Sequence, residues 1–440
     1  MFDTIIRNAR LIRSDLDEVG DVAIREGRIA AIGDISQTSA QNEIDARGLV
    51  LMSGVIDTQV HFREPGMEHK EDLESGTRAA ITGGVTAILE MPNTNPTTTT
   101  EEALLDKLER ASGRAWCDYG FFVGAATDNI DQLGRLETLP GVPGIKIFVG
   151  SSTGSLLVDA EEDLLRVFRS GHKRCPVHAE DETRNRERRA LLSESPHPRE
   201  HPFLRDEESA RIATERIIRI AGEADRPVHI LHVTTRQEPL LIAAAKGRGQ
   251  DVTAEVTPQH LYFSAPDCYE KLGTLAQMNP PIRSREHTEA LWRALAEGVF
   301  DVFGSDHAPH TLEEKAKPYP ASPSGMPGVQ TMLPLLLTFA AQGRLSLQLI
   351  AEMACEKPAE LYGMLGKGKL DLGYDADLVL VDPKRSYIFE RRMVQSKCGW
   401  SSYEGEPLTG SIEHVFLRGH QVVYEGELVG SPIGEMLHFA

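Results

Sequence analysis

Four side chains that commonly bind metal ions follow apolar segments of the sequence: His61, His178, His232 and Asp306. One histidine after a strand is more often a structural hydrogen-bonding residue than a ligand, but four residues at equivalent positions favour a shared site. Three imidazoles and one carboxylate offer nitrogen and oxygen ligands without thiolate, which suits Zn²⁺. A metal ion of this kind lowers the pKa of water from about 15.7 to about 7 and so provides hydroxide at neutral pH.

Lys146 interrupts the apolar segment Ile145–Val149 and needs a separate explanation. An isolated buried charge is costly, so the amine must be neutral, paired or modified. One interpretation is a side chain that reaches water beyond the end of the strand. The other is that the neutral amine reacts with carbon dioxide to form a carbamate, an anionic ligand whose two oxygens can bridge two metal ions.

The middle of the chain alternates eight apolar, strand-like segments with helical segments, two of which have Thr100 and Ser284 as predicted N-caps. Alternation predicts a parallel sheet, and eight repeats predict an α/β fold of the closed (β/α)₈ TIM type. An open doubly wound sheet is the alternative, and the lack of a G-x-G-x-x-G motif weakens it. A barrel carries its active site at the C-terminal ends of its strands, where the candidate ligands fall. The eight segments are Val50–Ile56, Val85–Met91, Gly120–Gly124, Ile145–Val149, Pro176–Ala179, Val228–Val233, Val252–Val256 and Val302–Ser305.

Both ends of the chain are rich in short strand-forming segments, such as Val22–Ile24 near the start and Gln421–Tyr424 near the end. We therefore expect a small β-sandwich domain formed by both chain termini, with the barrel inserted between its two parts. The expected boundaries are residues 1–52 for the N-terminal part, 53–365 for the barrel and 366–440 for the C-terminal part.

Composition limits the classes of partner. The chain has 440 residues, with 47 Lys and Arg against 66 Asp and Glu, a formal charge of −19. Such a surface argues against binding to nucleic acid or to an anionic membrane, and a small-molecule substrate is expected instead. No secretory signal is visible, the longest apolar stretch is too short to span a membrane, and the five cysteines form no C-x-x-C pair. A cytoplasmic protein is therefore expected.

Four motifs resemble those of dihydroorotases within the amidohydrolase superfamily, and the similarity extends from about Phe2 to Gly430. The resemblance implies reversible, metal-dependent hydrolysis of (S)-dihydroorotate to N-carbamoyl-L-aspartate in de novo pyrimidine biosynthesis. The motifs are Arg63-Glu-Pro-Gly66, Met91-Pro-Asn-Thr-Asn-Pro96, Asn279-Pro-Pro-Ile-Arg283 and Gly304-Ser-Asp-His-Ala-Pro-His310.

The resemblance also implies a role for each matching residue. His61 and Asp306 match ligands of the more buried metal, and Asp306 also matches the catalytic acid and base. His178 and His232 match ligands of a second, more exposed metal, and Lys146 matches a carbamylated lysine that bridges the two. The positions that match substrate contacts are Arg63, Asn93, Asn279, His310, Ser324 and Gly325, of which Arg63, Asn93 and His310 match groups that hold a carboxylate.

The sequence departs from the family in two places. Most members have a histidine pair after the first strand, whereas Gln59 takes the place of the first histidine here. A glutamine carbonyl is a poor zinc ligand, so Gln59 is a doubtful ligand and the chain is expected to bind one or two Zn²⁺ ions. The second departure is Gln259, which stands beside His260 where the family has two histidines.

Three functional hypotheses remain open from the sequence. Dihydroorotase is preferred because the planar fork of Arg63 matches a carboxylate that allantoin and simple hydantoins lack. A related cyclic amidase of the hydantoinase or allantoinase type is the second. The third is a catalytically silent partner of aspartate transcarbamoylase, for which Gln59 is the main support. A homodimer and an association with aspartate transcarbamoylase are the macromolecular partners considered.

Overall fold

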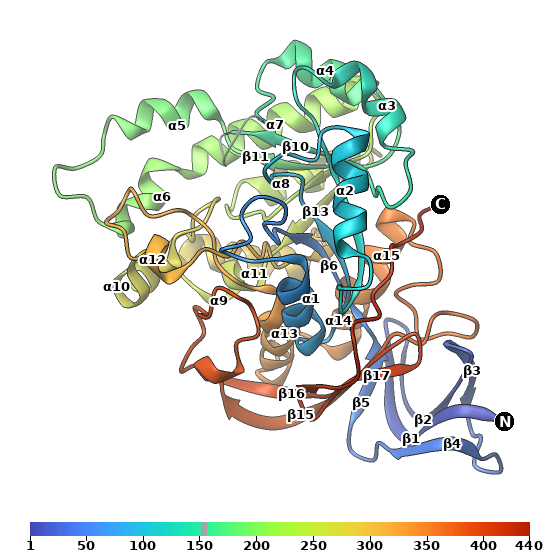
Figure 1. The fold of residues 1–440 in the computed structure, drawn as a ribbon. Coiled ribbons are helices and arrows are strands. Elements are labelled where there is room, and N and C mark those ends of the chain that lie inside the picture. Colours follow the sequence, from blue (N-terminus) through green and yellow to red (C-terminus); the bar gives the residue numbers. More distant parts are fainter. Residues whose placement is uncertain (151–155) are drawn as a thin grey trace.

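Eight parallel strand positions form a closed ring at the centre of the computed structural model, which describes residues 1–150 and 156–440 (Figure 1). One hydrogen-bonded group has the order β6-β7-β8, and the other runs from β9 to β14 in sequence order. The single residue Phe122 separates β8 from β9, so these two strands share one position. The ring closes where the N–H of His61 donates to the carbonyl of His307 at 2.7 Å. The barrel strands are β6 (Val55–Val60), β7 (Val85–Glu90), β8 (Asp118–Phe121), β9 (Val123–Gly124), β10 (Ile145–Val149), β11 (Cys175–Ala179), β12 (Val228–Ile230), β13 (Val252–Val256) and β14 (Val302–Phe303).

Helices cover the outside of this ring and confirm the predicted TIM-type barrel (Figure 1). Thr100 caps α2 as predicted, since its hydroxyl accepts from the N–H of Ala103 at 3.2 Å. Ser284 occupies the N-cap position of α11 as predicted, but its side chain forms no capping hydrogen bond. The helices are α1 (Leu73–Thr82), α2 (Glu101–Ala111), α3 (Leu133–Leu136), α4 (Glu161–Arg169), α5 (Glu182–Arg189), α6 (His201–Leu204), α7 (Glu207–Glu223), α8 (Glu238–Gly247), α9 (Pro258–Tyr262), α10 (Asp267–Leu272), α11 (Arg285–Ala296), α12 (Leu312–Lys315), α13 (Met332–Ala341), α14 (Leu347–Ala351) and α15 (Lys357–Tyr362).

A second sheet combines strands from both ends of the chain, which confirms the predicted β-rich terminal domain (Figure 1). Its order is β18-β17-β16-β15-β5-β1-β2-β3, and β4 pairs with β1. The C-terminal β15 runs antiparallel to the N-terminal β5, with Val379 opposite Met52. These strands are β1 (Phe2–Arg13), β2 (Leu16–Arg25), β3 (Arg28–Gly33), β4 (Ala40–Asp45), β5 (Val50–Ser53), β15 (Leu378–Ile388), β16 (Pro407–Leu417), β17 (His420–Tyr424) and β18 (Glu427–Leu428).

The apolar segment Val50–Ile56, expected to be one barrel strand, divides between the two sheets. Its first part is β5 of the terminal sheet and its second part begins β6 of the barrel, with Gly54 between them. Every residue of both strands is buried, so the apolar pattern does not show where one sheet gives way to the other. A Cβ atom at Gly54 would lie 2.1 Å from Oγ1 of Thr86, so the crossing requires glycine.

A buried lysine joins the terminal sheet to the barrel. The Nζ atom of Lys367 lies 2.5 Å from Asp118 of β8, 2.8 Å from Asp375 and 2.7 Å from Asp377. Burial alone would lower the pKa of Lys367, but the three carboxylates outweigh it and raise that pKa above its usual value. Because Asp118 belongs to the barrel and the other two carboxylates immediately precede β15, this cluster holds the two sheets together.

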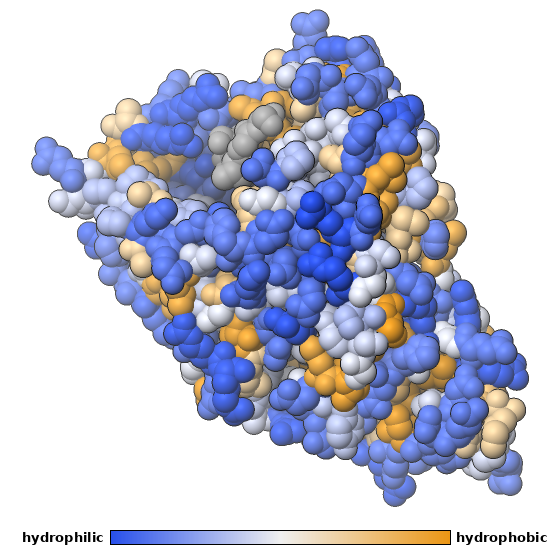
Figure 2. Space-filling view, in the orientation of Figure 1, coloured by the Kyte–Doolittle hydropathy of each residue, from blue (hydrophilic) through white to orange (hydrophobic). Residues whose placement is uncertain are grey.

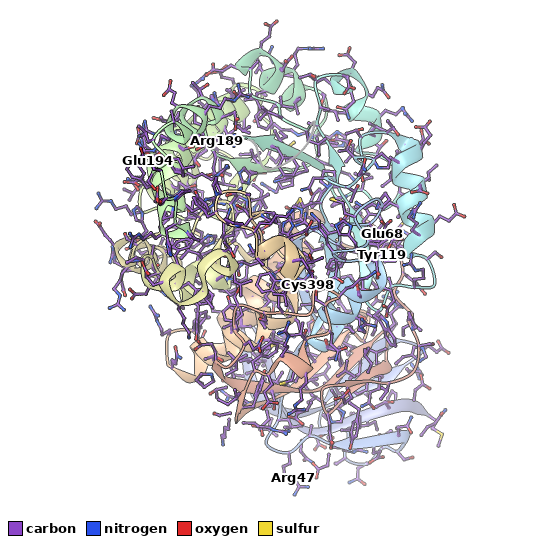
Figure 3. All side chains as sticks on the ribbon, turned by 60° about the vertical axis from the view of Figure 1, so that its left-hand side comes forward. Arg47, Glu68, Tyr119, Arg189, Glu194 and Cys398 are labelled. Carbon is purple, nitrogen blue, oxygen red and sulfur yellow. The ribbon has the colours of Figure 1, made fainter. Side chains whose placement is uncertain are left out.

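The surface agrees with the acidic composition. The face drawn in Figure 2 is mainly hydrophilic, with hydrophobic residues in small, separate groups. No helix among residues 1–150 and 156–440 is long and apolar enough to cross a membrane. Figure 3 places Arg189 and Glu194, beyond the barrel, at the opposite end of the molecule from Arg47 of the terminal sheet.

We expect Gly54→Ala to destabilise the protein, because the added methyl group would overlap Thr86 in a fully buried position. Overpacking of this kind typically costs about 1–3 kcal/mol. Thermal unfolding should show a lower Tm. Gly247→Ala is the matched control, since nothing lies within 4 Å of a Cβ at that position, and its Tm should not fall. Equal Tm values for the two variants would contradict the proposed close contact.

Candidate active site

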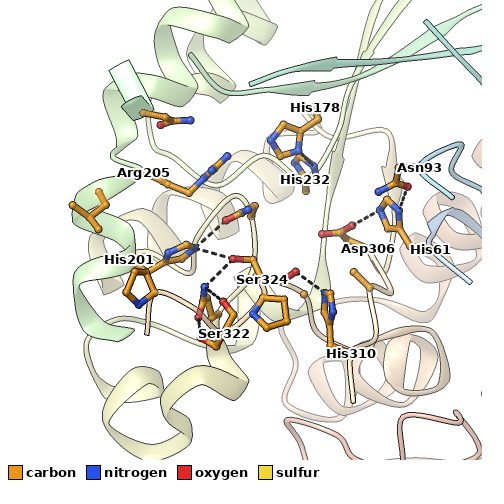
Figure 4. Close-up of a pocket in the computed structure, with 18 of the residues that line it drawn as sticks. His61, Asn93, His178, His201, Arg205, His232, Asp306, His310, Ser322 and Ser324 are labelled. Atoms are coloured by element: carbon orange, nitrogen blue, oxygen red, sulfur yellow. Dashed lines mark hydrogen bonds and ion pairs between the residues drawn. The ribbon is translucent and has the colours of Figure 1, made fainter. Parts of the chain in front are cut away.

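A cavity of about 540 Å³ opens at the C-terminal ends of the barrel strands (Figure 4). All of the residues that the sequence singled out for the site line this one cavity. They are Gln59, His61, Arg63, Asn93, Lys146, His178, His232, Asn279, Asp306, His310, Ser324 and Gly325. Their convergence follows from the barrel, because most of them lie in its strands or in the segments that leave those strands.

His61 and Asp306 form the first pair of candidate ligands. The Nε2 atom of His61 lies 3.2 Å from Oδ1 of Asp306, and its Nδ1 atom lies 2.6 Å from Oδ1 of Asn93 (Figure 4). Because an amide oxygen only accepts, Nδ1 carries the proton and Nε2 directs its lone pair toward the carboxylate. Gln59 donates from Nε2 to the same oxygen of Asp306 at 3.0 Å. Burial lowers the pKa of His61, which favours the neutral ligand form.

His178 and His232 form the second pair. Nδ1 of His178 lies 3.0 Å from Nε2 of His232, and Nε2 of His178 lies 2.8 Å from the carboxylate of Glu180. Burial lowers the pKa of both imidazoles, and for His232 the neighbouring His178 and Lys146 lower it further. Both rings are therefore neutral near pH 7, with two nitrogens facing each other.

Lys146 of β10 is a fully buried amine whose charge affects both pairs. Its Nζ atom has no hydrogen-bond partner among the described residues and lies 4.4 Å from the ring centre of Phe148. Burial lowers the pKa of Lys146 to about 7, against an opposing effect of Asp306 and Glu255. A substantial fraction of the amine is therefore neutral at neutral pH, which is the form that reacts as a nucleophile.

The candidate ligands form two pairs, and the spacing within each pair suits a divalent metal ion. In tetrahedral zinc sites with bonds of 2.0–2.1 Å, neighbouring ligand atoms lie about 3.3 Å apart, close to the separation within each pair here. No group of three or more His, Cys, Asp or Glu side chains within residues 1–150 and 156–440 is arranged to hold a metal ion. Each pair therefore needs a further ligand, and the partnerless amine of Lys146 is the nearby group that can provide one after modification.

The opposite wall of the cavity is positively charged. The buried guanidinium of Arg63 donates from Nε to the carbonyl of Pro309 at 3.1 Å, and no carboxylate of the described residues forms an ion pair with it. Burial lowers the pKa of Arg63 to about 10, so it stays protonated near pH 7. His310 lies between Arg63 and Lys70, and burial with these cations and Lys315 lowers its pKa far below the usual value. This wall is suited to an anionic group of a ligand.

Comparisons with known proteins agree with this geometry. Residues 214–422 match the amidohydrolase family, and residues 48–128 match a family described as dihydro-orotase-like. A dihydroorotase of Methanosarcina mazei is 35% identical, with 98% of this chain and 96% of that protein aligned. An allantoinase of Rubrobacter xylanophilus is 36% identical over 99% of this chain and 97% of that protein. The chain belongs to the amidohydrolase family.

A solved structure also resembles this amidohydrolase closely. The L-hydantoinase (dihydropyrimidinase) from Arthrobacter aurescens superposes with a TM-score of 0.95 and 31% identity, covering 99% of this chain and 100% of that one. The fold and the family relationship together identify the chain as a cyclic amide hydrolase.

Three residues of the amidohydrolase site have an unusual backbone conformation. The φ angles of Arg63, His232 and Asp306 are 66°, 33° and 44°. Residues other than glycine rarely adopt this left-handed region, and each such residue costs of the order of 1–3 kcal/mol. The surrounding barrel must therefore hold these three side chains in place, which is typical of residues selected for function.

Residues of the segment between β11 and β12 also reach the cavity, and the sequence did not assign them to the site. His201 of α6 lies 2.9 Å from Oδ1 of Asn279 and 3.0 Å from the carbonyl of Met278 through Nε2 (Figure 4). Burial lowers the pKa of His201 to about 4. Arg205 and Tyr319 line the same cavity. Neither His201 nor Arg205 directly follows a barrel strand, so the strand-end pattern in the sequence did not point to them.

The second departure from the family lies outside the cavity. His260 bonds within the protein, to the hydroxyl of Thr257 at 2.7 Å and the carbonyl of Pro280 at 3.1 Å. Gln259 donates to the carbonyl of Ser305 at 2.5 Å. Neither residue lines the cavity, so both act as supports for the backbone next to Asp306 and Asn279.

Lys315 holds the segment that carries Ser324 and Gly325. Its buried Nζ atom donates to the carbonyls of Gln277, Pro323 and Gly325 at 2.9–3.1 Å. The stretch Lys317–Gly328 is therefore held at its base by the amine of Lys315. Burial, together with the nearby charge of Arg63, lowers the pKa of Lys315 to about 7.

We expect Lys315→Met to lower the Tm, because three buried carbonyls would lose their donor. An unsatisfied buried polar group costs about 1–3 kcal/mol. The KM for substrate should also rise, since Ser324 and Gly325 lose their support. Lys317→Met, an exposed change two residues away, is the control and should leave both values unchanged. A KM for Lys315→Met equal to that of the control would show that the hydrogen bonds of Lys315 do not shape the cavity.

Proposed function

We propose that this amidohydrolase is a metal-dependent dihydroorotase that reversibly hydrolyses (S)-dihydroorotate to N-carbamoyl-L-aspartate in pyrimidine biosynthesis. The observation that carries the proposal is the buried guanidinium of Arg63, which lacks a carboxylate partner among the described residues and shares the cavity with two pairs of candidate ligands. Dihydroorotate is a ring with a cyclic amide and a carboxylate, so it fits both features. Dihydroorotases from three archaea, at 34–36% identity over 97–98% of this chain, support the same activity.

The metal would be held by His178 and His232 at one half of the site and by His61 and Asp306 at the other. When bound, Zn²⁺ supplies hydroxide at neutral pH and polarises the carbonyl of the ring amide. The neutral amine of Lys146 would attack carbon dioxide, forming an N–C bond and releasing one proton, and the resulting carbamate would be shared between the halves. Gln59 donates to Asp306 through its amide nitrogen, so one or two ions per chain remain the expected range.

Asp306 would move the proton during the reaction. Its carboxylate accepts a proton from the attacking water as the new C–O bond forms. It then returns that proton to the ring nitrogen as the C–N bond breaks, which gives a carboxylate and a ureido group. The amide of Gln59 donates to Oδ1 of Asp306 at 3.0 Å, which keeps the carboxylate directed into the cavity.

The charged wall would bind the carboxylate of the substrate. A guanidinium offers two parallel donors that match a carboxylate, and burial strengthens the interaction. Asn93 uses its oxygen for His61, so its amide nitrogen is the group left to contact substrate. His310 would assist Arg63 on the same wall, while Asn279, Ser324 and Gly325 would contact the ring. Lys315 lies close enough to influence His310 as well, whereas Lys70 is paired with Glu314 at 3.2 Å.

A hydantoinase or allantoinase activity is the second candidate, because relatives with those names are as similar as the dihydroorotases. Those ring classes do not require a carboxylate-binding wall, which is why dihydroorotate is preferred. The retained ligand pairs count against a catalytically silent protein. A homologous segment of the multifunctional protein CAD of Squalus acanthias is 34% identical over 89% of this chain. Homodimerisation, association with aspartate transcarbamoylase and a cytoplasmic location stay predictions.

The direct test is metal removal combined with a substrate panel. We expect a strong chelator to abolish hydrolysis of dihydroorotate and added Zn²⁺ to restore it, because the proposed nucleophile is hydroxide that the metal ion supplies. Dihydroorotate, hydantoin and allantoin should be assayed side by side, with the carboxylate substrate preferred. Full activity in rigorously metal-free protein would contradict the mechanism. A preference for allantoin or hydantoin would assign the second candidate function instead.

Arg63→Lys tests the carboxylate contact separately from the chemistry. Lysine keeps the positive charge but loses the paired donors, and a hydrogen bond to a charged group contributes about 1.5–3 kcal/mol. We therefore expect kcat/KM for dihydroorotate to fall by roughly 10- to 150-fold. Arg211→Lys, on the surface of α7, should have no effect. Unchanged efficiency in Arg63→Lys would remove the basis for preferring dihydroorotate.

A further inference from the structure

A buried ion pair lies directly behind His178, on the side away from His232. Glu180 is fully buried, and its carboxylate accepts from Nε2 of His178 at 2.8 Å. Nε of Arg205 lies 3.1 Å from each carboxylate oxygen, and its Nη2 also donates to Oε2. Arg205 thus forms an ion pair with this carboxylate, and His178 donates to it as well. A carboxylate in direct contact with a guanidinium is stabilised in its ionised form.

An ionised carboxylate on one imidazole nitrogen determines what the other nitrogen can do. A carboxylate only accepts, so Nε2 of His178 carries the proton. In the neutral ring Nδ1 then has a free lone pair, and this atom faces His232 at 3.0 Å. If the proton moved to Nδ1, that nitrogen could not bind a metal ion. The same contact holds the ring in its orientation.

We propose that Glu180, held by Arg205, is the positioning residue for the His178–His232 half of the metal site, an inference that rests on the proposed function. Glu180 fixes the tautomer and orientation of His178 and increases the basicity of Nδ1. Outer-shell carboxylates of this kind typically change metal affinity by about 10- to 100-fold. Neither Glu180 nor Arg205 is assigned to bind the metal.

The sequence motif Asn279–Arg283 provides the connection to the second histidine. Nη1 of Arg283 donates to the backbone carbonyl of Arg205 at 2.8 Å, and its Nε donates to the hydroxyl of Thr234 at 3.0 Å. Thr234 lies two residues after His232, in the segment that leaves β12. Arg283 is buried and therefore links the Glu180–Arg205 pair to the backbone that carries His232. Arg283 takes no part in the metal and substrate contacts proposed above.

The test measures zinc affinity directly. Full-length protein is stripped with a chelator, and Zn²⁺ is titrated back in bicarbonate buffer against a chromophoric chelator. We expect Glu180→Gln to weaken zinc binding by about 10- to 100-fold, because glutamine keeps the size but removes the charge. His178→Ala, which removes the ligand itself, sets the upper limit of the effect. Arg184→Met is the control, since Arg184 pairs with Asp206 near the surface of the same region and should not alter the affinity.

A second variant separates positioning from folding. Glu180→Gln leaves Arg205 buried without its carboxylate, so the double variant Glu180→Gln/Arg205→Met removes both charges together. We expect this variant to bind zinc as weakly as Glu180→Gln. The Tm of each metal-free protein is measured in parallel. A lower Tm in the metal-free state with zinc affinity within twofold of wild type would show a purely structural ion pair and overturn the inference. Wild-type protein that binds no zinc would overturn the proposed function as well.

Discussion

Placing a cation inside a barrel costs free energy unless an anion accompanies it, and this cost governs the arrangement of the cavity. For the buried cations of Lys367 and Arg205, ion pairs with carboxylates of the protein offset this cost. Lys146 and Arg63 have no such partner among the described residues, and burial lowers the pKa of each. Conversion to a carbamate that binds a metal ion would remove the positive charge of Lys146. A carboxylate of the substrate would pair with the charge of Arg63. Under the proposed function, the protein would be complementary to its ligands because these two charges lack a carboxylate partner among the described residues.

The barrel allows this arrangement because it fixes the backbone independently of the cavity. Hydrogen bonds between neighbouring strands hold the ring, and the His61–His307 contact closes it beside the first ligand. Arg63, His232 and Asp306 can then adopt backbone angles that an isolated segment would avoid. The same rigidity keeps the two pairs of candidate ligands in place on four strands, so that Lys146, from a fifth strand, can lie near both.

The sequence predicted the barrel and most members of the cavity because strand ends are local features, whereas Asn279, Ser324 and Gly325 were assigned only through the resemblance to dihydroorotases. An apolar run followed by His61, or by Asp306, can be recognised without knowing what lies beside it. His201 and Arg205 were not predicted, since they come from the long segment between β11 and β12, in which α5 and α6 extend away from the ring (Figure 1). Only tertiary packing brings that segment back over the cavity. The division of Val50–Ile56 at Gly54 was missed for a related reason, because strands buried in two different sheets have the same apolar pattern.

The terminal sheet has a practical consequence for handling the molecule. Strands from both chain ends share that sheet, and the Lys367 cluster attaches it to the barrel away from the opening of the cavity. In Figure 1 both termini lie on the side opposite α5 and α6, whose segment borders the opening. An affinity tag, a surface linkage or a fused domain at either end would therefore leave the cavity accessible to small molecules. Removing the strands at either end would be different, because it would take away half of the sheet on which the other end depends.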